Sequence, residues 1–228
     1  MKPKQLKAPF TWDERKVLLQ DRVWYVPSYY SDYQSWEFPG WSHPDFFGNE
    51  QPVVVEYCCG NGAWITEKAQ QHQDKNWIAV EKRFDRVRKV WSKIRNLNLS
   101  NLVIVCGEAQ TVTQQYIPRE SIQEVYVNFP DPWPKERHAK HRLIQPAFVK
   151  DVTRVLQKKG TFTLVTDDPG YSEQSIAVLL AEQGLVSCHP DPYYVTEWPD
   201  YGASYFDSLW REKGRTIRYH TFIKKDGE

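Results

Sequence analysis

From residue 51 onward, short apolar segments alternate with longer amphipathic ones, and this alternation limits the possible folds more than any other feature. Runs rich in Val, Ile and Leu predict strands, and most are followed by a segment with the apolar spacing of a helix. The predicted strands are Val53–Tyr57, Trp77–Glu81, Leu102–Cys106, Glu124–Asn128 and Thr161–Thr166. Alternation of this kind is typical of a parallel sheet between helices, so the sequence predicts a doubly wound α/β domain.

Four helices and one further strand complete this prediction. The helices are expected at residues 63–71, 83–97, 143–156 and 172–183. Two lysines and a glycine at 158–160 favour the end of the third helix there, because cations and glycine are common at helix C-termini. The alternating segment 216–224 predicts a final strand at the edge of the sheet.

Residues 1–50 differ from the rest of the chain. Twelve aromatic residues lie between Phe10 and Phe47, and Thr11 and Glu14 have the spacing of a capping box, which favours a short helix. Aromatic side chains most often pack in cores and interfaces, so we expect packing on the main domain, with a contribution to a substrate surface as the alternative. The sequence therefore predicts an N-terminal extension, 1–50, and a main domain, 51–228.

Composition and charge narrow the class of protein. A formal net charge of +1 over 228 residues means that any nucleic-acid binding must come from local basic patches. The four cysteines show no C-x-x-C spacing, so we interpret them as reduced thiols and expect no metal site. No apolar run has membrane length, and the basic start lacks the apolar core of a signal peptide. These features predict a cytoplasmic protein without a membrane segment.

The most unusual segment is 128–142, N-F-P-D-P-W-P-K-E-R-H-A-K-H-R. Three prolines in five residues exclude a helix. Proline also lacks the backbone N–H that pairs neighbouring strands, so the chain should leave the preceding strand in a fixed loop. The loop places one carboxylate, Asp131, beside the indole of Trp133, and six Lys, Arg or His residues follow between Lys135 and Arg142. These features favour a site for a polyanion that carries a flat base, since α/β sheets bind ligands at the carboxyl ends of strands. A solvated, proline-rich turn is the alternative.

Acidic side chains accompany the first three predicted strands. Glu56 precedes the turn Gly60-Asn61-Gly62, Glu81 ends the second strand, and Glu108 follows the third. A nicotinamide cofactor is disfavoured, because the third fingerprint glycine is missing and Glu56 would repel a pyrophosphate. The same carboxylate would attract the sulfonium and amino groups of S-adenosylmethionine, Glu81 could accept hydrogen bonds from a ribose diol, and Glu108 could reach the adenine amine. Each acid alone is a weak signal, because strand ends commonly carry solvated acids.

The glycine turn, the acid after the second strand and above all the motif at 128–142 resemble the bacterial tRNA (guanine-N7)-methyltransferases, over roughly Val53 to Tyr219. The resemblance implies a Rossmann-like class I methyltransferase fold, with three α/β/α layers around a mostly parallel, seven-stranded sheet. It also implies methyl transfer from S-adenosyl-L-methionine to N7 of a guanine in tRNA, namely guanine 46 of the variable loop.

The resemblance further implies roles for individual residues. The residues expected to bind the methyl donor are Glu56, Gly60, Glu81, Glu108 and Asp131, and Asp131 is also the expected catalytic residue. The residues expected to bind the substrate are Lys135, Asp167, Ser204 and Asp207. The last two lie in S-x-F-D-x-x-W, where the family has T-x-Y-E and then an aromatic residue. Cys58 stands where the family usually has glycine, and a Cβ there makes a positive φ costly.

Methylation at guanine N7 requires no prior loss of a proton, because N7 carries a lone pair. Catalysis would then consist of alignment and electrostatics. A carboxylate that accepts hydrogen bonds from the base edge favours the positive charge that the base gains; Asp131 is the first candidate, and Asp167 or Asp207 could share the role. Seven Lys or Arg between Lys82 and Arg95 predict a second patch for the RNA backbone, with a solvated helix face as the alternative.

Two other functions stay open at this point. A methyltransferase that acts on an exocyclic amine is one, because N-F-P-D has some similarity to the N-P-P-aromatic loop of those enzymes. An RNA-binding protein with a non-catalytic methyltransferase fold is the other, and Cys58 is its only indication. The sequence leaves open whether the protein is a monomer or a homodimer.

Overall fold

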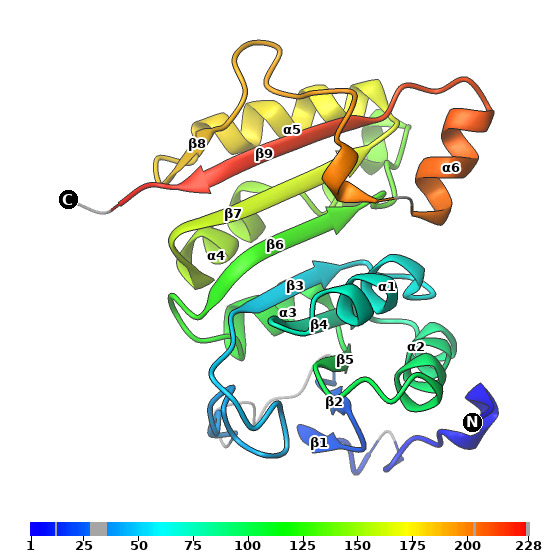
Figure 1. The fold of residues 1–228 in the computed structure, drawn as a ribbon. Coiled ribbons are helices and arrows are strands. Elements are labelled where there is room, and N and C mark those ends of the chain that lie inside the picture. The colour runs from blue at the N-terminus through cyan, green and yellow to red at the C-terminus, as the bar shows by residue number, and fades with distance from the viewer. Residues whose placement is uncertain (12, 28–35, 203, 227–228) are drawn as a thin grey trace. The chain divides into compact units, whose positions relative to one another are not determined.

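The structure is a computed structural model that describes residues 1–11, 13–27, 36–202 and 204–226. The chain forms two compact units: unit 1, Met1–Pro118, and unit 2, Arg119–Glu228. Each unit has its own strands and its own covering helices (Figure 1). The predicted boundary at residue 50 lies inside unit 1 and stays a prediction.

Unit 1 is built on strands in the order β1-β2-β5-β4-β3. They are β1 Leu18–Gln20, β2 Val23–Tyr25, β3 Val53–Tyr57, β4 Asn76–Glu81 and β5 Leu102–Cys106. All neighbours in this order run parallel except β1, which is antiparallel to β2. Every residue of β3 and β4 is buried, because helices cover both faces of these strands, and this explains their nearly continuous apolar sequence.

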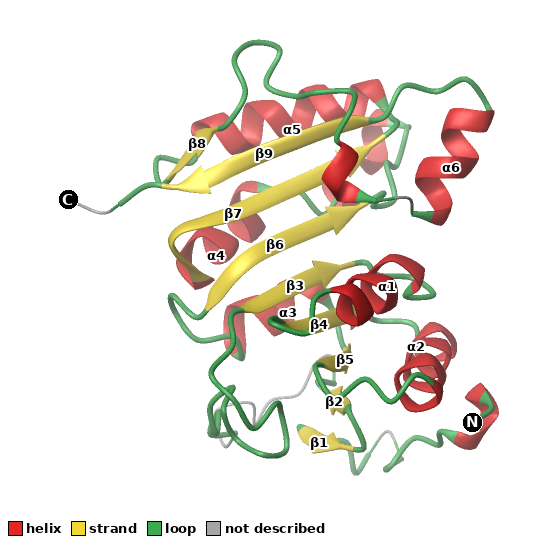
Figure 2. Cartoon of the chain, viewed as in Figure 1, coloured by secondary structure: helices red, strands yellow, loops and turns green. Residues whose placement is uncertain are grey.

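The helices of unit 1 are η1 Pro3–Gln5, α1 Ala63–Gln71, α2 Phe84–Asn96 and α3 Ala109–Gln115. Helices α1 and α2 lie on one face of the strands and α3 lies on the other (Figure 2). The short, mostly polar α3 has a weak apolar pattern and was absent from the predicted elements.

The described part of the aromatic N-terminal segment packs within unit 1, as the sequence predicts. Trp24 of β2 is fully buried, and β2 pairs with β5. Five other rings lie 5.2–6.3 Å from Trp24 between centroids: Trp36, Phe38, Trp41, Phe46 and Tyr116. The described residues after Thr11 form no helix, so that prediction is wrong, although the Thr11 hydroxyl donates to Glu14 at 2.9 Å. A single capping contact does not overcome the cost of starting a helix.

Unit 2 has strands in the order β6-β7-β9-β8. They are β6 Ile122–Asn128, β7 Leu156–Thr166, β8 Leu185–Ser187 and β9 Arg218–Lys224. Strands β6 and β7 are parallel, and β9 is antiparallel to both β7 and β8. The prediction of an edge strand at the C-terminus is therefore wrong, because the three-residue β8 covers the outer side of β9.

The helices of unit 2 are η3 Glu136–His141, α4 Pro146–Val155, α5 Pro169–Ala181, η4 Pro199–Tyr201 and α6 Tyr205–Glu212. Helices α4 and α5 lie against one face of the strands (Figure 2). The helix predicted at 143–156 is α4, but residues 158–160 lie inside β7 and do not form its C-terminus as predicted. The helix ends at Val155 and β7 begins at once, since Leu156 pairs with Ile122 and a register shift follows.

The predicted α/β fold is confirmed. Seven strands, β3–β9, follow residue 50 in the described ranges, and β1 and β2 are additional to them. None of the helices in the described residues is long and apolar enough to span a membrane.

His220 of β9 is a buried, neutral histidine. Its Nδ1 donates to the Tyr193 carbonyl at 3.2 Å, so its Nε2 accepts from the Ser172 hydroxyl at 3.1 Å. Burial lowers the pKa of His220 from 6.5 to about 4. As the pH falls below 6.5, the unfolded chain binds this proton before the folded chain does, so His220 makes the folded state progressively less stable down to about pH 4.

We therefore expect this histidine to lower the free energy of unfolding by about 2 kcal/mol between pH 7.5 and pH 5. Urea unfolding of the wild type and of His220→Gln at both pH values measures this, and the variant should depend less on pH by that amount. An equal pH dependence of the two proteins would contradict the assignment.

Candidate functional site

In unit 1, three acids lie at the carboxyl ends of adjacent parallel strands, as the sequence predicts. Glu56 of β3 pairs with Ala79 of β4, and Glu81 at the end of β4 pairs with Cys106 of β5. The Gly107 amide donates to the Glu81 carbonyl at 3.1 Å, so Glu108 follows directly at the same edge. The first two side chains are buried, and that of Glu108 is exposed. Unit 1 thus brings its predicted donor-binding acids to one edge of the sheet.

The turn after β3 has a left-handed backbone at three positions. Cys58, Gly60 and Gly62 have φ of 58°, 57° and 66°. For Cys58 this conformation costs about 1–2 kcal/mol, because its Cβ crowds the following carbonyl. Gly62 precedes α1, and a Cβ there would lie 2.7 Å from Cγ2 of Val90 in α2. The turn therefore requires glycine at residue 62 for space as well as for conformation.

Glu81 is held by two contacts, one from the residue that precedes α2 and one from the first turn of α2. Its Oε1 accepts from the Arg83 amide at 2.8 Å, and its Oε2 forms an ion pair with Arg86 at 3.4 Å. Arg86 thus positions a predicted donor-binding carboxylate.

The neighbouring thiols remain protonated near neutral pH. Burial raises the pKa of Cys59 well above its usual range, and Glu56 and Glu81 act in the same direction. Burial also raises the pKa of Cys106 to about 11, and Glu81 adds to this. A neutral thiol at these two positions adds no charge next to the acids.

Most cations of α2 and of the residues before it make contacts within unit 1. Arg83 pairs with Asp85 at 3.1 Å, Arg88 donates to the Leu6 carbonyl at 2.9 Å, and Arg95 pairs with Asp21 at 3.2 Å. Lys82 and Lys89 are exposed and form no ion pair with a described residue. Lys82, just before α2, and Lys89 are therefore the exposed cations of this segment without an ion pair to a described residue, and RNA binding by the segment stays a prediction.

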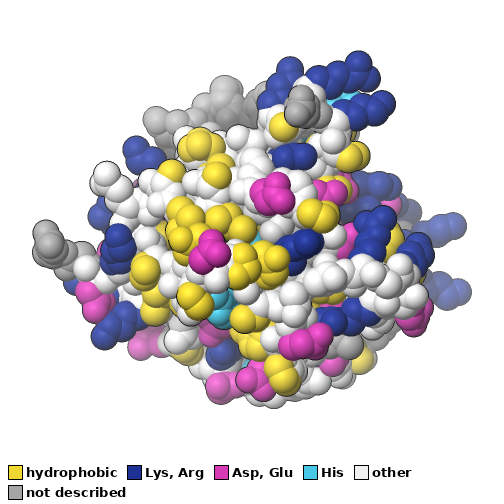
Figure 3. Space-filling model, turned by 90° about the horizontal axis from the view of Figure 1, so that it is seen from above, with side chains coloured by type: hydrophobic (Ala, Val, Ile, Leu, Met, Phe, Trp, Pro, Cys, Tyr) yellow, Lys and Arg dark blue, Asp and Glu magenta, His cyan; other side chains and the backbone are white. Residues whose placement is uncertain are grey.

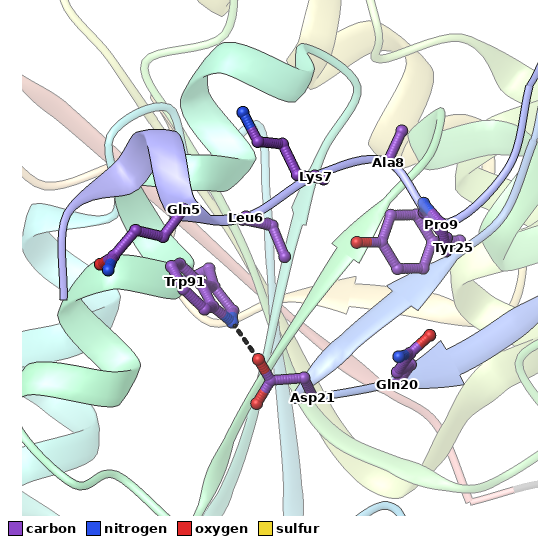
Figure 4. Close-up of a pocket in the computed structure, with 9 residues that line it drawn as sticks. All are labelled: Gln5, Leu6, Lys7, Ala8, Pro9, Gln20, Asp21, Tyr25 and Trp91. Atoms are coloured by element: carbon purple, nitrogen blue, oxygen red, sulfur yellow. Dashed lines mark hydrogen bonds between the residues drawn. The ribbon is translucent and has the colours of Figure 1, made fainter.

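A pocket of about 290 Å³ lies beside the N-terminal segment of unit 1 (Figure 4). Trp91 Nε1 donates to Asp21 Oδ2 at 3.0 Å in its wall. None of the predicted site residues lines it. The residues that do are Gln5, Leu6, Lys7, Ala8, Pro9, Gln20, Asp21, Tyr25 and Trp91.

In unit 2, the proline-rich loop after β6 is fixed by its backbone and by one arginine. The Phe129 amide donates to the Val165 carbonyl at 2.9 Å, and Phe129 and Trp133 have positive φ of 48° and 43°. Such angles are uncommon for bulky residues. Arg142 donates to the carbonyls of Pro132 and Trp133 at 2.8 and 3.3 Å. The chain thus leaves β6 in a hydrogen-bonded, non-helical loop, as predicted, and Arg142, predicted to bind RNA, donates to carbonyls of this loop.

The predicted reactive groups of this loop are exposed. Asp131 is exposed and makes no hydrogen bond to a residue that the structure describes. The ring of Trp133 is 5.8 Å from that of His138 and 5.3 Å from that of His141. The remaining loop cations with exposed side chains are Lys135, Arg137 and Lys140. Asp131 and these cations are available for a ligand.

The other predicted substrate residues make contacts within unit 2. Asp167, just after β7, forms an ion pair with Arg215. Ser204 caps α6, since its hydroxyl accepts from the Asp207 amide at 3.1 Å. The buried Asp207 carboxylate accepts from Arg211 Nε at 2.8 Å and from the Tyr219 hydroxyl.

Tyr219 remains protonated in this group. Burial raises its pKa to about 12, and the bond to Asp207 adds to this. Ser204 and Asp207 therefore fix α6, and their role in binding substrate stays a prediction. The spacing of Asp207 and Arg211, four residues apart on a helix, was the available signal for their ion pair.

Solved structures share this fold at low sequence identity. The 16S rRNA methyltransferase KamB has a TM-score of 0.60 and 15% identity over 84% of this chain and 96% of that chain. The [4+2]-cyclase SpnF has a TM-score of 0.56 and 12% identity over 78% of this chain and 76% of that chain. The likeness shows the α/β fold alone, and the cyclase illustrates that one fold carries different chemistries.

Sequence comparison defines the class and then the family. A family model described as a putative methyltransferase matches residues 50–219, so the chain belongs to the methyltransferases. The tRNA (guanine-N(7)-)-methyltransferases of Chlamydia caviae and Chlamydia muridarum are 49% and 51% identical over 227 residues, which covers 100% of both chains in each case. That of Aeromonas hydrophila is 37% identical over 60% of this chain and 58% of its own length. The chain belongs to the tRNA (guanine-N(7)-)-methyltransferase family, and the resemblance in the sequence is confirmed.

Proposed function

We propose that this protein transfers a methyl group from S-adenosyl-L-methionine to N7 of guanine 46 in the variable loop of tRNA. The observation that carries the proposal is the 49–51% identity, over the full length, to chlamydial proteins named as tRNA (guanine-N(7)-)-methyltransferases. Methylation of an exocyclic amine and RNA binding without catalysis have no comparable support.

The acids of unit 1 support a cationic methyl donor. Glu56 and Glu81 are buried carboxylates at adjacent strand ends, and Glu108 follows the third strand. This set suits a ligand with a sulfonium, a ribose diol and an adenine amine, and it disfavours a pyrophosphate. The bound donor would supply a methyl group on a positively charged sulfur. In our proposal Gly60, in the turn between β3 and α1, lets the donor approach bare backbone.

Asp131 is the proposed catalytic residue of unit 2. It is exposed on a loop whose backbone is held by prolines and by Arg142, and its carboxylate has no internal hydrogen-bond partner among the described residues, so it is free to bind a ligand. It would accept hydrogen bonds from the base edge and stabilise the charge that the base gains. Lys135 and Asp167 would bind the target nucleotide.

Incubation with methyl-labelled donor and bulk tRNA tests the proposal. N7-methylguanine is positively charged and makes the strand cleavable after mild reduction and aniline, so we expect label in tRNA and cleavage at guanine 46. Label without cleavage would exclude N7 as the target, and identification of the labelled nucleoside would then test the exocyclic amine. Absence of label at saturating donor would indicate a binding protein.

The exposed lysines of unit 1 give a separate prediction. The double variant Lys82→Glu, Lys89→Glu should bind tRNA more weakly. The slope of log affinity against log salt should become less negative by about 1–2, since each lost phosphate contact removes about 0.7–0.9 from its magnitude. Titrations at several salt concentrations measure this. A matched control is Lys150→Glu with Lys158→Glu, because these lysines are also exposed and the change in net charge is the same. Equal slopes in both variants would mean that the face of α2 is only solvated.

A further inference from the structure

Two residues in the loop after β6 have a backbone conformation that is costly for a bulky side chain. Phe129 lies two residues before Asp131 and Trp133 two residues after it, and their φ angles are 48° and 43°. Such conformations persist only where surrounding contacts hold them. Phe129 has such a contact, since its amide donates to the Val165 carbonyl of β7 at 2.9 Å. The backbone at Asp131 therefore also depends on what holds the other side of the loop.

Arg142 holds that other side. Its Nε donates to the Pro132 carbonyl at 2.8 Å, and its Nη2 donates to the Trp133 carbonyl at 3.3 Å. Many Lys and Arg side chains project into solvent in the view from above (Figure 3), whereas that of Arg142 is half-buried and donates to these carbonyls. The guanidinium must stay in one orientation to hold both of them.

Gln174 of α5 fixes this orientation. Its Oε1 accepts from Nη1 of Arg142 at 3.3 Å, and its Nε2 donates to the Ile144 carbonyl at 2.8 Å. A guanidinium can only donate and a carbonyl can only accept, so the two ends of the amide serve both partners at once. Replacement of Gln174 by an apolar side chain would leave Nη1 of Arg142 without this acceptor.

Helix α5 is itself anchored at this end. Tyr171 is fully buried and lies one turn before Gln174, on the same face of the helix. Its amide donates to the capping Asp168 at 2.7 Å, and its hydroxyl accepts from the Ile144 amide at 3.1 Å. The Arg142 guanidinium lies 5.5 Å from the centre of its ring. Figure 1 shows that α5 begins on the side of unit 2 where β6 ends.

We propose that Gln174 is a positioning residue for Asp131. Its amide orients the Arg142 guanidinium, and the guanidinium keeps the two carbonyls that follow Asp131, and with them the backbone of Asp131, in the conformation that methyl transfer requires. Gln174 acts through Arg142 and does not itself contact the base. The inference rests on the proposed function for the role of Asp131.

Single-turnover methylation of tRNA by Gln174→Leu tests this inference. The substitution removes both hydrogen bonds at similar side-chain size. The methylation rate should fall about 10–100-fold, because a displacement of about 1 Å in an active site can cost about 100-fold. The affinities for tRNA and for the methyl donor should stay as in the wild type, since Gln174 contacts neither.

Two further variants show whether the contact with Arg142 is responsible. Gln174→Glu keeps the acceptor for Arg142 and loses only the bond to the Ile144 carbonyl, so it should keep most of the wild-type rate. Gln183→Leu is the matched control, because it makes the same change at an exposed glutamine just after α5. It should methylate tRNA at the wild-type rate. Equal losses in Gln174→Leu and Gln183→Leu would overturn the proposal, as would a wild-type rate in Gln174→Leu.

Combination with Asp131→Asn separates positioning of Asp131 from a general structural role. If Gln174 acts through the loop that carries Asp131, Gln174→Leu should cause little further loss of rate in the Asp131→Asn background. Independent effects would instead multiply. A further loss as large as that in the wild-type background would therefore overturn the proposal.

Hydrogen exchange separates failure of this inference from failure of the proposed function. The amides of Arg142 and Ile144 donate to the Ala139 carbonyl and the Tyr171 hydroxyl, and both should exchange faster in Gln174→Leu. Unchanged exchange would overturn the inference. If the wild type forms no N7-methylguanine while Gln174→Leu still exchanges faster, the proposed function fails and the link between α5 and the loop stands.

Discussion

Replacing Asp131 by asparagine should lower the turnover number about 10²–10³-fold, the loss typical of removing one preorganised electrostatic group from an active site. The substitution keeps the shape of the side chain and removes only its charge. Folding should be unchanged, because Asp131 is exposed and forms no hydrogen bond within the described part of the chain. The affinity for tRNA should stay the same or rise slightly, since a negative charge is removed from a surface that meets a polyanion.

Single-turnover methylation at saturating tRNA and donor measures this loss directly. Glu173→Gln is the matched control, because Glu173 is also an exposed acid of unit 2 that changes to its amide. The control should methylate tRNA at the wild-type rate. Wild-type turnover in Asp131→Asn would remove this carboxylate from the mechanism. A parallel loss of tRNA affinity would make it a binding residue.

The sequence predicted the features that follow from the regular geometry of a parallel sheet. Apolar runs identified β3, β4 and β5, and an acid at or just after the end of each strand must reach the same edge when the strands run parallel. Three prolines similarly predicted a fixed loop around Asp131 without knowledge of its neighbours. These predictions needed only local chain properties.

The partners of the cations could not be predicted in the same way. The sequence shows that Arg86, Arg142 and Arg215 are charged. Their contacts depend on which distant parts of the chain the fold brings next to them. Arg142 reaches carbonyls ten and nine residues earlier, and Arg215 reaches a carboxylate 48 residues earlier. Cations expected to bind RNA therefore proved to hold Glu81 and the proline-rich loop. Charge patterning identifies a basic segment, and only the structure shows which of its cations remain exposed.

The contributions of the N-terminal segment and of β9 depend on pairing between distant strands. The aromatic residues before residue 50 gave no strand pattern, yet β2 pairs with β5, about 80 residues later in the chain. Likewise, β9 is internal only because the three-residue β8 pairs with its outer side. Strands this short carry too little pattern to be recognised from sequence alone.

Gly62→Ala should destabilise the protein by about 2–5 kcal/mol, the sum of about 1–2 for a left-handed alanine and about 1–3 for an overpacked contact. The added Cβ would lie 2.7 Å from Cγ2 and 3.1 Å from Cγ1 of Val90, so α1 and α2 must move apart. Gly60→Ala is the matched control. Its φ is also positive, but its Cβ would meet nothing closer than 4.0 Å, so only the conformational cost of about 1–2 kcal/mol applies.

Urea unfolding of both variants, and of each glycine substitution in a Val90→Ala background, separates the two contributions. With Val90 shortened, the cost of Gly62→Ala should fall toward that of Gly60→Ala, because the contacts at 2.7 and 3.1 Å are removed and only the contact at 3.3 Å from the Cβ of residue 90 remains. An undiminished cost would place the clash elsewhere in the turn. Because Arg86, which pairs with Glu81, lies in α2, displacement of α2 should also weaken binding of the methyl donor. In Gly62→Ala, stability and donor affinity should fall together. Val90→Ala lowers stability by itself because it leaves a cavity, but in that background the further loss caused by Gly62→Ala should be smaller for both quantities.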